Sequence, residues 1–154
     1  MPGVSTDPST GVSLPVRRAI MEDAAEIARL TAQLGYPTAP DAIARRLTVL
    51  LPASEHAVWV AGDDSALAGW LHVAVTRALE YEPCAEILGL VVDEARRGRG
   101  AGARLVAAAE AWAREQGLSE MRVRSRVSRE GAHRFYARLG YLEWKRQVAF
   151  RKAL

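Results

Sequence analysis

The chain is 154 residues long, and its hydrophobic share of 49% and charged share of 25% are those of an ordinary globular protein that buries a core. A membrane span needs about 20 consecutive apolar residues, and neither such a run nor the apolar segment of a signal peptide is present. The net charge of +3 is spread along the chain, whereas nucleic-acid-binding proteins gather basic residues in a stripe. We therefore expect a cytoplasmic protein that binds neither membranes nor nucleic acids.

The cysteine and lysine contents bear on metal binding and on the source of the protein. Cys84 is the single cysteine, so an intrachain disulfide cannot form and no cysteine-based metal site is expected. Lys145 and Lys152 are the only lysines beside many arginines, and alanine is abundant, a bias that suggests a GC-rich bacterial genome. The composition therefore predicts a bacterial protein without a bound metal.

The N-terminal part of the chain predicts a tail, a strand and a helix. Residues 1–14 are rich in Pro, Gly, Ser and Thr and offer little to bury, so a disordered tail is expected. A short strand is expected over residues 16–19. The helical spacing of apolar residues then predicts a helix over 22–34, which Gly35 is placed to end in a left-handed conformation.

A second helix and a β-hairpin follow. Thr38 is expected to cap the helix, which should reach about Leu51. Strands are predicted over residues 56–61 and 67–75, because Gly62-Asp63-Asp64-Ser65 between them is a strong hairpin signal. A loop over 76–83 completes this part of the chain.

The next segment joins a buried strand to a helix through a glycine-rich turn. The apolar run over residues 87–92 predicts the strand, and a charged loop over 93–97 leads into Gly98-Arg99-Gly100-Ala101-Gly102. Free backbone N–H groups and the positive end of the helix dipole would face any ligand at this turn. Arg96, Arg97 and Arg99 add charge, so the pattern predicts a pyrophosphate site.

The C-terminal segment predicts a strand over residues 121–126, a helix and a β-rich tail over 141–154. Ser128 is expected to cap the helix, whose inner face carries Ala132, Phe135, Tyr136 and Leu139. Residues 15–154 thus predict one α/β domain with a mixed, mostly antiparallel sheet flanked by about four helices.

Two nucleotide-binding patterns fit the glycine turn less well. The run from Gly98 to Ala103 satisfies a loose dinucleotide pattern, with Glu120 downstream, and would suggest an NADPH-dependent reductase. In that fold the turn abuts the strand, however, whereas here a five-residue loop intervenes. A P-loop is weaker still, because no Gly-Lys-Ser/Thr follows.

A different family fits both the turn and a second motif. Arg97-Gly98-Arg99-Gly100-Ala101-Gly102 resembles the acetyl-CoA signature [RQ]-x-x-G-x-[GA] of the GCN5-related N-acetyltransferases, the GNAT superfamily. The run from Ala132 to Tyr141 is similar to the superfamily's A-x-x-F-Y-x-x-x-G-[FY] segment. The element order β-α-α-β-β-β-α-β-α-β also agrees, and the resemblance covers residues 15–154.

The resemblance implies how the donor, acetyl-CoA, is bound as a co-substrate. Backbone groups of Leu90, Val91 and Val92 would pair with the pantetheine arm as an added strand does, and an N–H at the end of this strand could stabilise the oxyanion. Phe135 would also contact the cofactor. Many relatives carry Asn where this chain has Arg129, which could reach a phosphate instead. The pyrophosphate would lie on the turn formed by Arg97, Gly98, Arg99, Gly100, Ala101, Gly102 and Ala103.

The resemblance also implies catalytic residues. Ala85-Glu86-Ile87 looks like the strand segment that carries the general base, and His72 in the neighbouring strand is the rival base, with water as a third route. Tyr136 matches the tyrosine that protonates the departing thiolate, although a buried aromatic would show the same spacing. Cys84 as an acetyl-accepting nucleophile lacks a paired histidine.

The expected function is transfer of an acetyl group from acetyl-CoA to a primary amine of a small molecule or peptide, by direct attack in a ternary complex. The alternative is a non-catalytic acyl-CoA-binding or sensing module. The loops 35–40 and 76–83 should bound the acceptor site, where Glu80 and Glu82 would favour a cationic amine. The segment from Arg129 to Phe150 is reminiscent of aminoglycoside-type relatives, and a homodimer is common in the superfamily.

Overall fold

The computed structural model describes residues 14–154, which form two units that meet in the sequence after Arg122. The first unit ends at Arg122 and the second runs from Val123 to Leu154. The tail predicted over residues 1–14 lies outside the described residues except for Leu14. No helix in the described part of the chain is long and apolar enough to cross a membrane.

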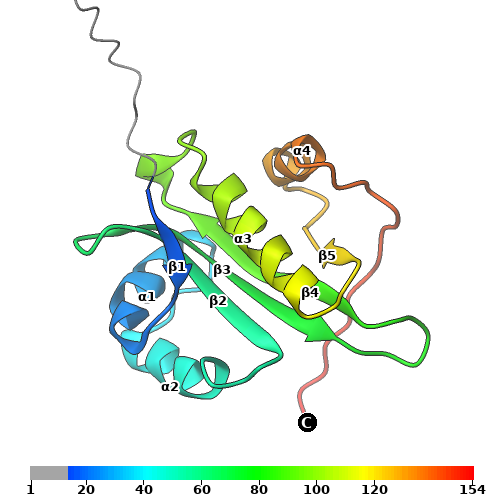
Figure 1. Ribbon diagram of the computed structural model, residues 1–154, viewed down its shortest axis with the longest axis horizontal. Coiled ribbons are helices and arrows are strands. Elements are labelled where there is room, and N and C mark those ends of the chain that lie inside the picture. The colour runs from blue at the N-terminus through cyan, green and yellow to red at the C-terminus, as the bar shows by residue number, and fades with distance from the viewer. Residues whose placement is uncertain (1–13) are drawn as a thin grey trace, which may run out of the picture. The chain divides into compact units, whose positions relative to one another are not determined.

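A five-stranded sheet organises the first unit, in the order β1-β2-β3-β4-β5 (Figure 1). The pairs β1–β2, β2–β3 and β3–β4 are all antiparallel, as predicted. The central strands are buried almost throughout, because they are rich in β-branched and apolar residues and both faces of the sheet are covered. The strands are β1 (Val16–Arg18), β2 (His56–Gly62), β3 (Leu67–Thr76), β4 (Cys84–Val92) and β5 (Met121–Val123).

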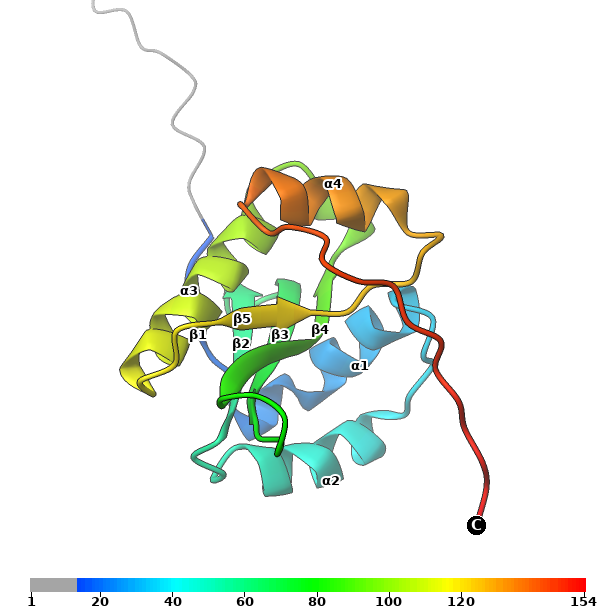
Figure 2. The same ribbon diagram turned by 90° about the vertical axis from the view of Figure 1, so that its right-hand side faces the viewer.

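Helices cover both faces of this sheet (Figures 1 and 2). On one face lie α1 (Ala24–Gln33), preceded by a 3-10 turn over Met21–Asp23, and α2 (Pro40–Leu50). On the other lies α3 (Ala101–Glu115), whose Leu105 is fully buried against β3. The core between the sheet, α1 and α2 contains Ala19, Ala24, Ile27, Ala28, Leu30, Ile43, Leu47, Val58, Val60, Leu67 and Val91.

A β-bulge in β4 sets which of its side chains face α1 and α2. His72 pairs with Gly89 and Val73 pairs with Ile87, so Leu88 is the extra residue. Directly opposed residues of antiparallel strands point to the same face. Because Glu86 pairs with Ala74, two residues after His72 on β3, Glu86, His72 and Gly89 share one face of the sheet.

The second unit contains α4 (Glu130–Arg138) and a long C-terminal segment. The prediction of a β-rich tail was wrong, since residues 141–154 form neither strand nor helix. Their apolar alternation is real, but Leu142, Trp144 and Phe150 are exposed. Alternation alone does not make a strand, because the backbone groups also need a neighbouring strand to pair with.

Smaller departures from the predicted elements occur at their ends. The strand expected over 121–126 is only three residues long, and the central strand begins earlier than expected, at Cys84. Neither predicted side-chain cap forms: the Thr38 hydroxyl donates to the carbonyl of Tyr36 (2.8 Å), and α4 begins after Arg129 rather than Ser128. Pro40 at the first turn of α2 supplies the helical φ without a cap.

Candidate functional site

The glycine turn after β4 has the backbone conformation that an anion-binding loop requires. A 3-10 turn, η2 (Glu94–Arg96), leads into Gly98 and Gly100, both of which adopt φ of +79°. A left-handed backbone is strained for other residues, and a Cβ at either glycine would meet no atom within 4 Å. Glycine is therefore needed here for its backbone conformation, and the outer side of the turn stays open to a ligand.

The N-terminus of α3 opens at this turn. Gly100 precedes the first helical residue, so the N–H groups of the first turn have no carbonyl one turn earlier within the helix. The exposed side chains of Arg97 and Arg99 add positive charge, with Arg97 held 4.0 Å from Glu94. Ala101 and Gly102 are buried against the core. Backbone donors, the helix dipole and two nearby guanidinium groups thus make this turn electropositive.

Asp93 anchors this turn to α1. Its carboxylate accepts hydrogen bonds from Arg29 (3.0 Å), Gln33 (3.3 Å) and the backbone N–H of Ala95 (3.1 Å). The backbone N–H of Glu94 donates to the side chain of Gln33 (3.0 Å). The hydrogen bond from Ala95 and the Arg29 guanidinium hold the pKa of the Asp93 carboxyl below its usual range. The turn therefore rests on a charged network that sequence patterns did not indicate.

Arg29 carries that network on to β3. Its guanidinium also binds Glu26 (2.7 Å) and the carbonyl of Leu67 (3.0 Å), and Glu26 accepts the backbone N–H of Leu67 (3.0 Å). The hydrogen bond from Arg29 lowers the pKa of Glu26. One arginine thus ties together α1, the start of β3 and the end of β4.

The predicted pantetheine-binding residues lie at the C-terminal end of β4. Leu90, Val91 and Val92 pair with Leu71, Trp70 and Gly69 of β3. On the other side, β5 is three residues long against nine for β4, and the first residues of β4 bond there, Ala85 N–H to Glu120 carbonyl (3.0 Å). Since β5 is too short to pair along all of β4, the strand offers backbone groups to an extended ligand.

Glu86 is buried on β4, where the sequence analysis placed a base. The hydroxyl of Thr76 donates to its carboxylate (3.3 Å). It shares its sheet face with His72, the rival base. His72 Nε2 lies 3.0 Å from His56 Nδ1, and burial together with His56 lowers the pKa of His72 to about 4. The His72 imidazole is therefore neutral at pH 7 and a weaker base than an ordinary histidine.

The second unit holds the other predicted site residues, on and beside α4. Tyr136 is half-buried, and its ring packs edge-on against Phe135 (centroids 5.1 Å apart) and Tyr141 (5.6 Å). Burial raises the pKa of Tyr136 to about 12, although the charge of Arg129 acts in the opposite direction. The phenol thus keeps its proton throughout the physiological range. Arg129 itself is exposed at the N-terminus of α4.

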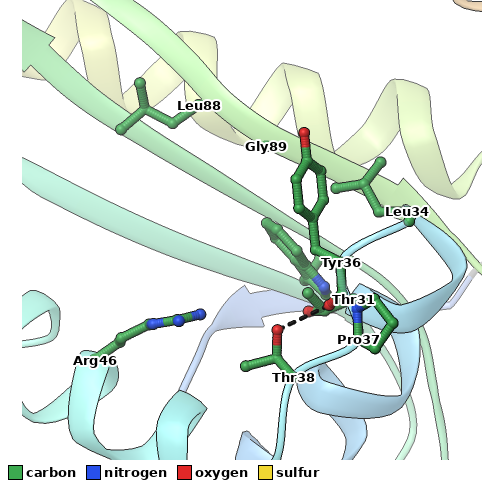
Figure 3. A pocket seen from close by; sticks show the side chains of 10 residues that line it. Thr31, Leu34, Tyr36, Pro37, Thr38, Arg46, Leu88 and Gly89 are labelled. Atoms are coloured by element: carbon green, nitrogen blue, oxygen red, sulfur yellow. Dashed lines mark hydrogen bonds between the residues drawn. The ribbon is translucent and has the colours of Figure 1, made fainter. Parts of the chain in front are cut away.

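A cavity of about 550 Å³ lies on the face of the sheet that α1 and α2 cover (Figure 3). Gly89 is one of its lining residues, and a larger residue there would clash with Trp70, because an added Cβ would lie 2.8 Å from the Trp70 ring. Leu88, the bulge residue, is half exposed at its edge. The lining residues come from α1, the following loop, α2, β3 and β4: Thr31, Leu34, Gly35, Tyr36, Pro37, Thr38, Arg46, Trp70, Leu88 and Gly89.

Two expectations about the acceptor side meet a different arrangement. Of the two predicted bounding loops, the one over 35–40 lines this cavity but the one over 76–83 does not. Glu80 and Glu82 are exposed and are not lining residues. Burial raises the pKa of the Cys84 thiol, which keeps it protonated and disfavours a role as nucleophile. Sequence patterns did not indicate Arg46 and Trp70 as site residues. Helical spacing predicted Arg46 on the outer side of its helix, and Trp70 lay within a predicted strand.

Strand, glycine turn and helix N-terminus on an antiparallel sheet define an acetyltransferase fold, and comparison with known proteins agrees. The model of the acetyltransferase (GNAT) family matches residues 21–141. The chain therefore belongs to the GNAT family, and it is an N-acetyltransferase that uses acetyl-CoA. Within residues 14–154, no three His, Cys, Asp or Glu side chains cluster so as to hold a metal ion.

Individual relatives are similar to this chain in sequence or in structure. The chain is 33% identical over 144 residues to an aminoglycoside N(6')-acetyltransferase type 1 of Stenotrophomonas maltophilia, covering 90% of this chain and 93% of the relative. A protein of the same name from Serratia marcescens is 32% identical over 68% of this chain and 75% of its own length. A structure of AAC(6')-Iy with the bisubstrate analogue CoA-S-monomethyl-acetylneamine has a TM-score of 0.80 at 21% identity, covering 92% and 99% of the two chains.

Replacing Asp93 with Asn should weaken both the fold and the binding of acetyl-CoA. The amide loses the charge-assisted bonds to Arg29, so we expect a loss of about 1–2 kcal/mol in the free energy of unfolding, measured by urea denaturation. The apparent KM for acetyl-CoA should rise because the glycine turn loses its anchor. Asp64→Asn, in the exposed hairpin loop, is the matched control. An unchanged KM in Asp93→Asn would contradict the anchoring role.

Proposed function

We propose that this protein transfers the acetyl group of acetyl-CoA to a primary amine of a small molecule, by direct attack of the amine in a ternary complex. One observation carries the proposal. The cavity is lined by Leu88 and Gly89, next to the stretch of β4 whose backbone would hold the pantetheine arm. An amine in the cavity would thus approach the thioester at the bulge.

The donor side of the proposal uses the glycine turn and β4. The pyrophosphate would accept hydrogen bonds from the backbone between Arg97 and Ala103, and the pantetheine amides would pair with Leu90, Val91 and Val92. Arg129 would contribute a cation and Phe135 an apolar contact to the same cofactor, as the family motif implies. The structure of AAC(6')-Iy, a protein of similar fold, holds a CoA-based analogue, which supports CoA as the ligand of such a fold.

On the acceptor side, Glu86 would take the proton that the amine must lose. A primary amine is mostly protonated at pH 7, so it attacks only after deprotonation. Glu86 is not among the lining residues of the cavity but lies on the same sheet face as Gly89, so a bridging water would carry the proton to it. His72 is the rival base, and its pKa of about 4 makes it a weaker base than an ordinary histidine.

Tyr136 would complete the reaction by giving its proton to the departing thiolate. The bond from carbonyl carbon to sulfur breaks as the bond from carbonyl carbon to nitrogen forms, and the thiolate receives one proton. A pKa of about 12 keeps the Tyr136 phenol protonated for this step. The setting we propose is the bacterial cytoplasm, in keeping with the bacterial relatives and a single cysteine that is not in a disulfide.

A thiol-release assay with acetyl-CoA and a panel of amines tests the function. The panel should include aminoglycosides, the class named in the curated relatives, together with amino acids, polyamines and simple alkylamines. We expect free CoA with at least one primary amine and none with its N,N-dimethyl analogue. Binding of acetyl-CoA, detected as a rise in Tm, without thiol release from any amine would instead indicate a sensing module.

Replacing Glu86 with Gln should lower kcat by about 100-fold at pH 7, because the amine loses its proton acceptor. The loss should shrink at higher pH, where more of the amine is already deprotonated. His72→Gln is the matched comparison on the neighbouring strand and should change kcat less than Glu86→Gln. The opposite order of the two variants would move the base to His72.

Replacing Tyr136 with Phe should slow the reaction without abolishing it. A thiolate with a pKa near 8.5 is a fair leaving group, so we expect a fall in kcat of about 10- to 100-fold. In the wild-type protein the Tyr136 pKa of about 12 predicts no alkaline loss of kcat from this residue between pH 7 and 10. Tyr141→Phe, which removes the neighbouring phenol oxygen, is the control; an alkaline limb present in wild type but absent in Tyr136→Phe would refute the high pKa.

A further inference from the structure

We propose that the preferred acceptor carries a carboxylate or phosphate beside its primary amine, and that Arg46 binds this anionic group. This inference deepens the proposed function and rests on it, since it names the substrate class of the same cavity. It differs from what the relatives' names suggest, because aminoglycosides carry several cationic amines.

Arg46 stands where two hollows of the first unit meet. It lines the 550 Å³ cavity described above and also a second hollow of about 520 Å³. His72 lines the second hollow and is the cross-strand partner of Gly89, which lines the first. The two hollows are therefore neighbours on one sheet face, with Arg46 common to both. The second is lined by Ala42, Arg45, Arg46, Val49, Leu50 and His72.

The charged residues that line the two hollows are all positive. Arg46 is the single charged residue in the lining of the first cavity, and Arg45 and Arg46 are the charged residues in that of the second. Neither lining contains a carboxylate. Figure 3 shows the Arg46 side chain extending from its helix toward the space beneath Leu88. A cleft with walls of positive charge attracts anions and repels a polyammonium ligand.

The guanidinium groups of Arg45 and Arg46 are available to a ligand. Several arginines of the first unit are bound to carboxylates, as in Arg17–Asp23 (2.8 Å), Arg29–Asp93 (3.0 Å) and Arg77–Glu55 (2.7 Å). Over residues 14–154, by contrast, the guanidinium groups of Arg45 and Arg46 take part in no hydrogen bond or ion pair. Arginine presents paired N–H donors that match a carboxylate or phosphate in two-point contact.

The remaining lining residues define the rest of the acceptor. Leu34, Trp70 and Leu88 add apolar surface to the lining of the same cavity. The reacting amine must reach the Gly89 end, where the thioester would lie under the proposed function. The acceptor is thus a primary amine that also carries an anionic group, as in an amino acid or an amino phosphate.

The test compares acceptors that differ only in charge. L-amino acids, their carboxamides and the amines lacking the carboxyl group are assayed by thiol release at low salt, beside an aminoglycoside and an amino phosphate. We expect kcat/KM for an anionic amine to exceed that of its neutral counterpart by about 10-fold or more. In Arg46→Gln this ratio should fall toward one, through a rise in KM for the anionic amine.

One control variant and one inhibition measurement make the result specific. Arg114→Gln, on α3 and paired with Glu110, removes a surface charge elsewhere and should leave the ratio unchanged. The N-acetylated amino acid should inhibit competitively with the amine, more strongly than its carboxamide does. A shared preference for amino acids and amino phosphates supports the inference, whichever of the two is better.

The outcomes separate this inference from the function on which it rests. Transfer to neutral or polycationic amines without any preference for an anionic group, or a preference that survives Arg46→Gln, overturns the inference and leaves the proposed function standing. No transfer to any amine overturns the proposed function and the inference with it.

Discussion

The bond between Arg29 and Asp93 is the contact on which the donor side of this molecule depends. The glycine turn has few contacts of its own, because its backbone must remain open to a ligand. Its position is set instead by a carboxylate at the end of β4, which is bound to a guanidinium that also holds β3. The charged pair is half screened, with Arg29 40% exposed, so its contribution is one of position more than of stability.

The sheet provides the second constraint, since its two faces pack against different helices. One face packs against α3 through fully buried side chains such as Leu71 and Leu105, and it sets where the N-terminus of α3 lies. The other face meets α1 and α2, and here the core gives way to a cavity near the bulge. The donor turn and the acceptor cavity are therefore held by the same elements, α1, β3 and β4.

The sequence predicted this fold well where local pattern and tertiary need agree. The central strand, the glycine turn and the helix after it follow from apolar runs and from glycines whose φ values are positive. The same reasoning failed for residues 141–154, where alternation suggested a strand but no pairing occurs. It also failed for the caps at Thr38 and Ser128, because either hydroxyl could serve a neighbouring turn as well.

The same distinction separates the site residues that local motifs predicted from those that they did not. Glu86 and the turn from Arg97 to Ala103 could be placed from motifs, because these residues lie close together in sequence. Asp93 and Arg29 are 64 residues apart, and no local signal links them. Arg46 looked like an ordinary exposed residue of a helix, and only the folded chain places it beside Trp70 and Gly89.

The extra residue Leu88 has a consequence for how this chain can vary. Side chains on a strand alternate in direction, so one additional residue inverts the orientation of the residues before the bulge relative to those after it. Deleting a single residue at the bulge would turn Glu86 away from α1 and α2 and into the layer beneath α3, without altering any catalytic side chain. The number of residues in β4 is thus constrained more tightly than their identity. Adding or removing one residue there would move the side chain of Glu86, the proposed base, to the opposite face of the sheet.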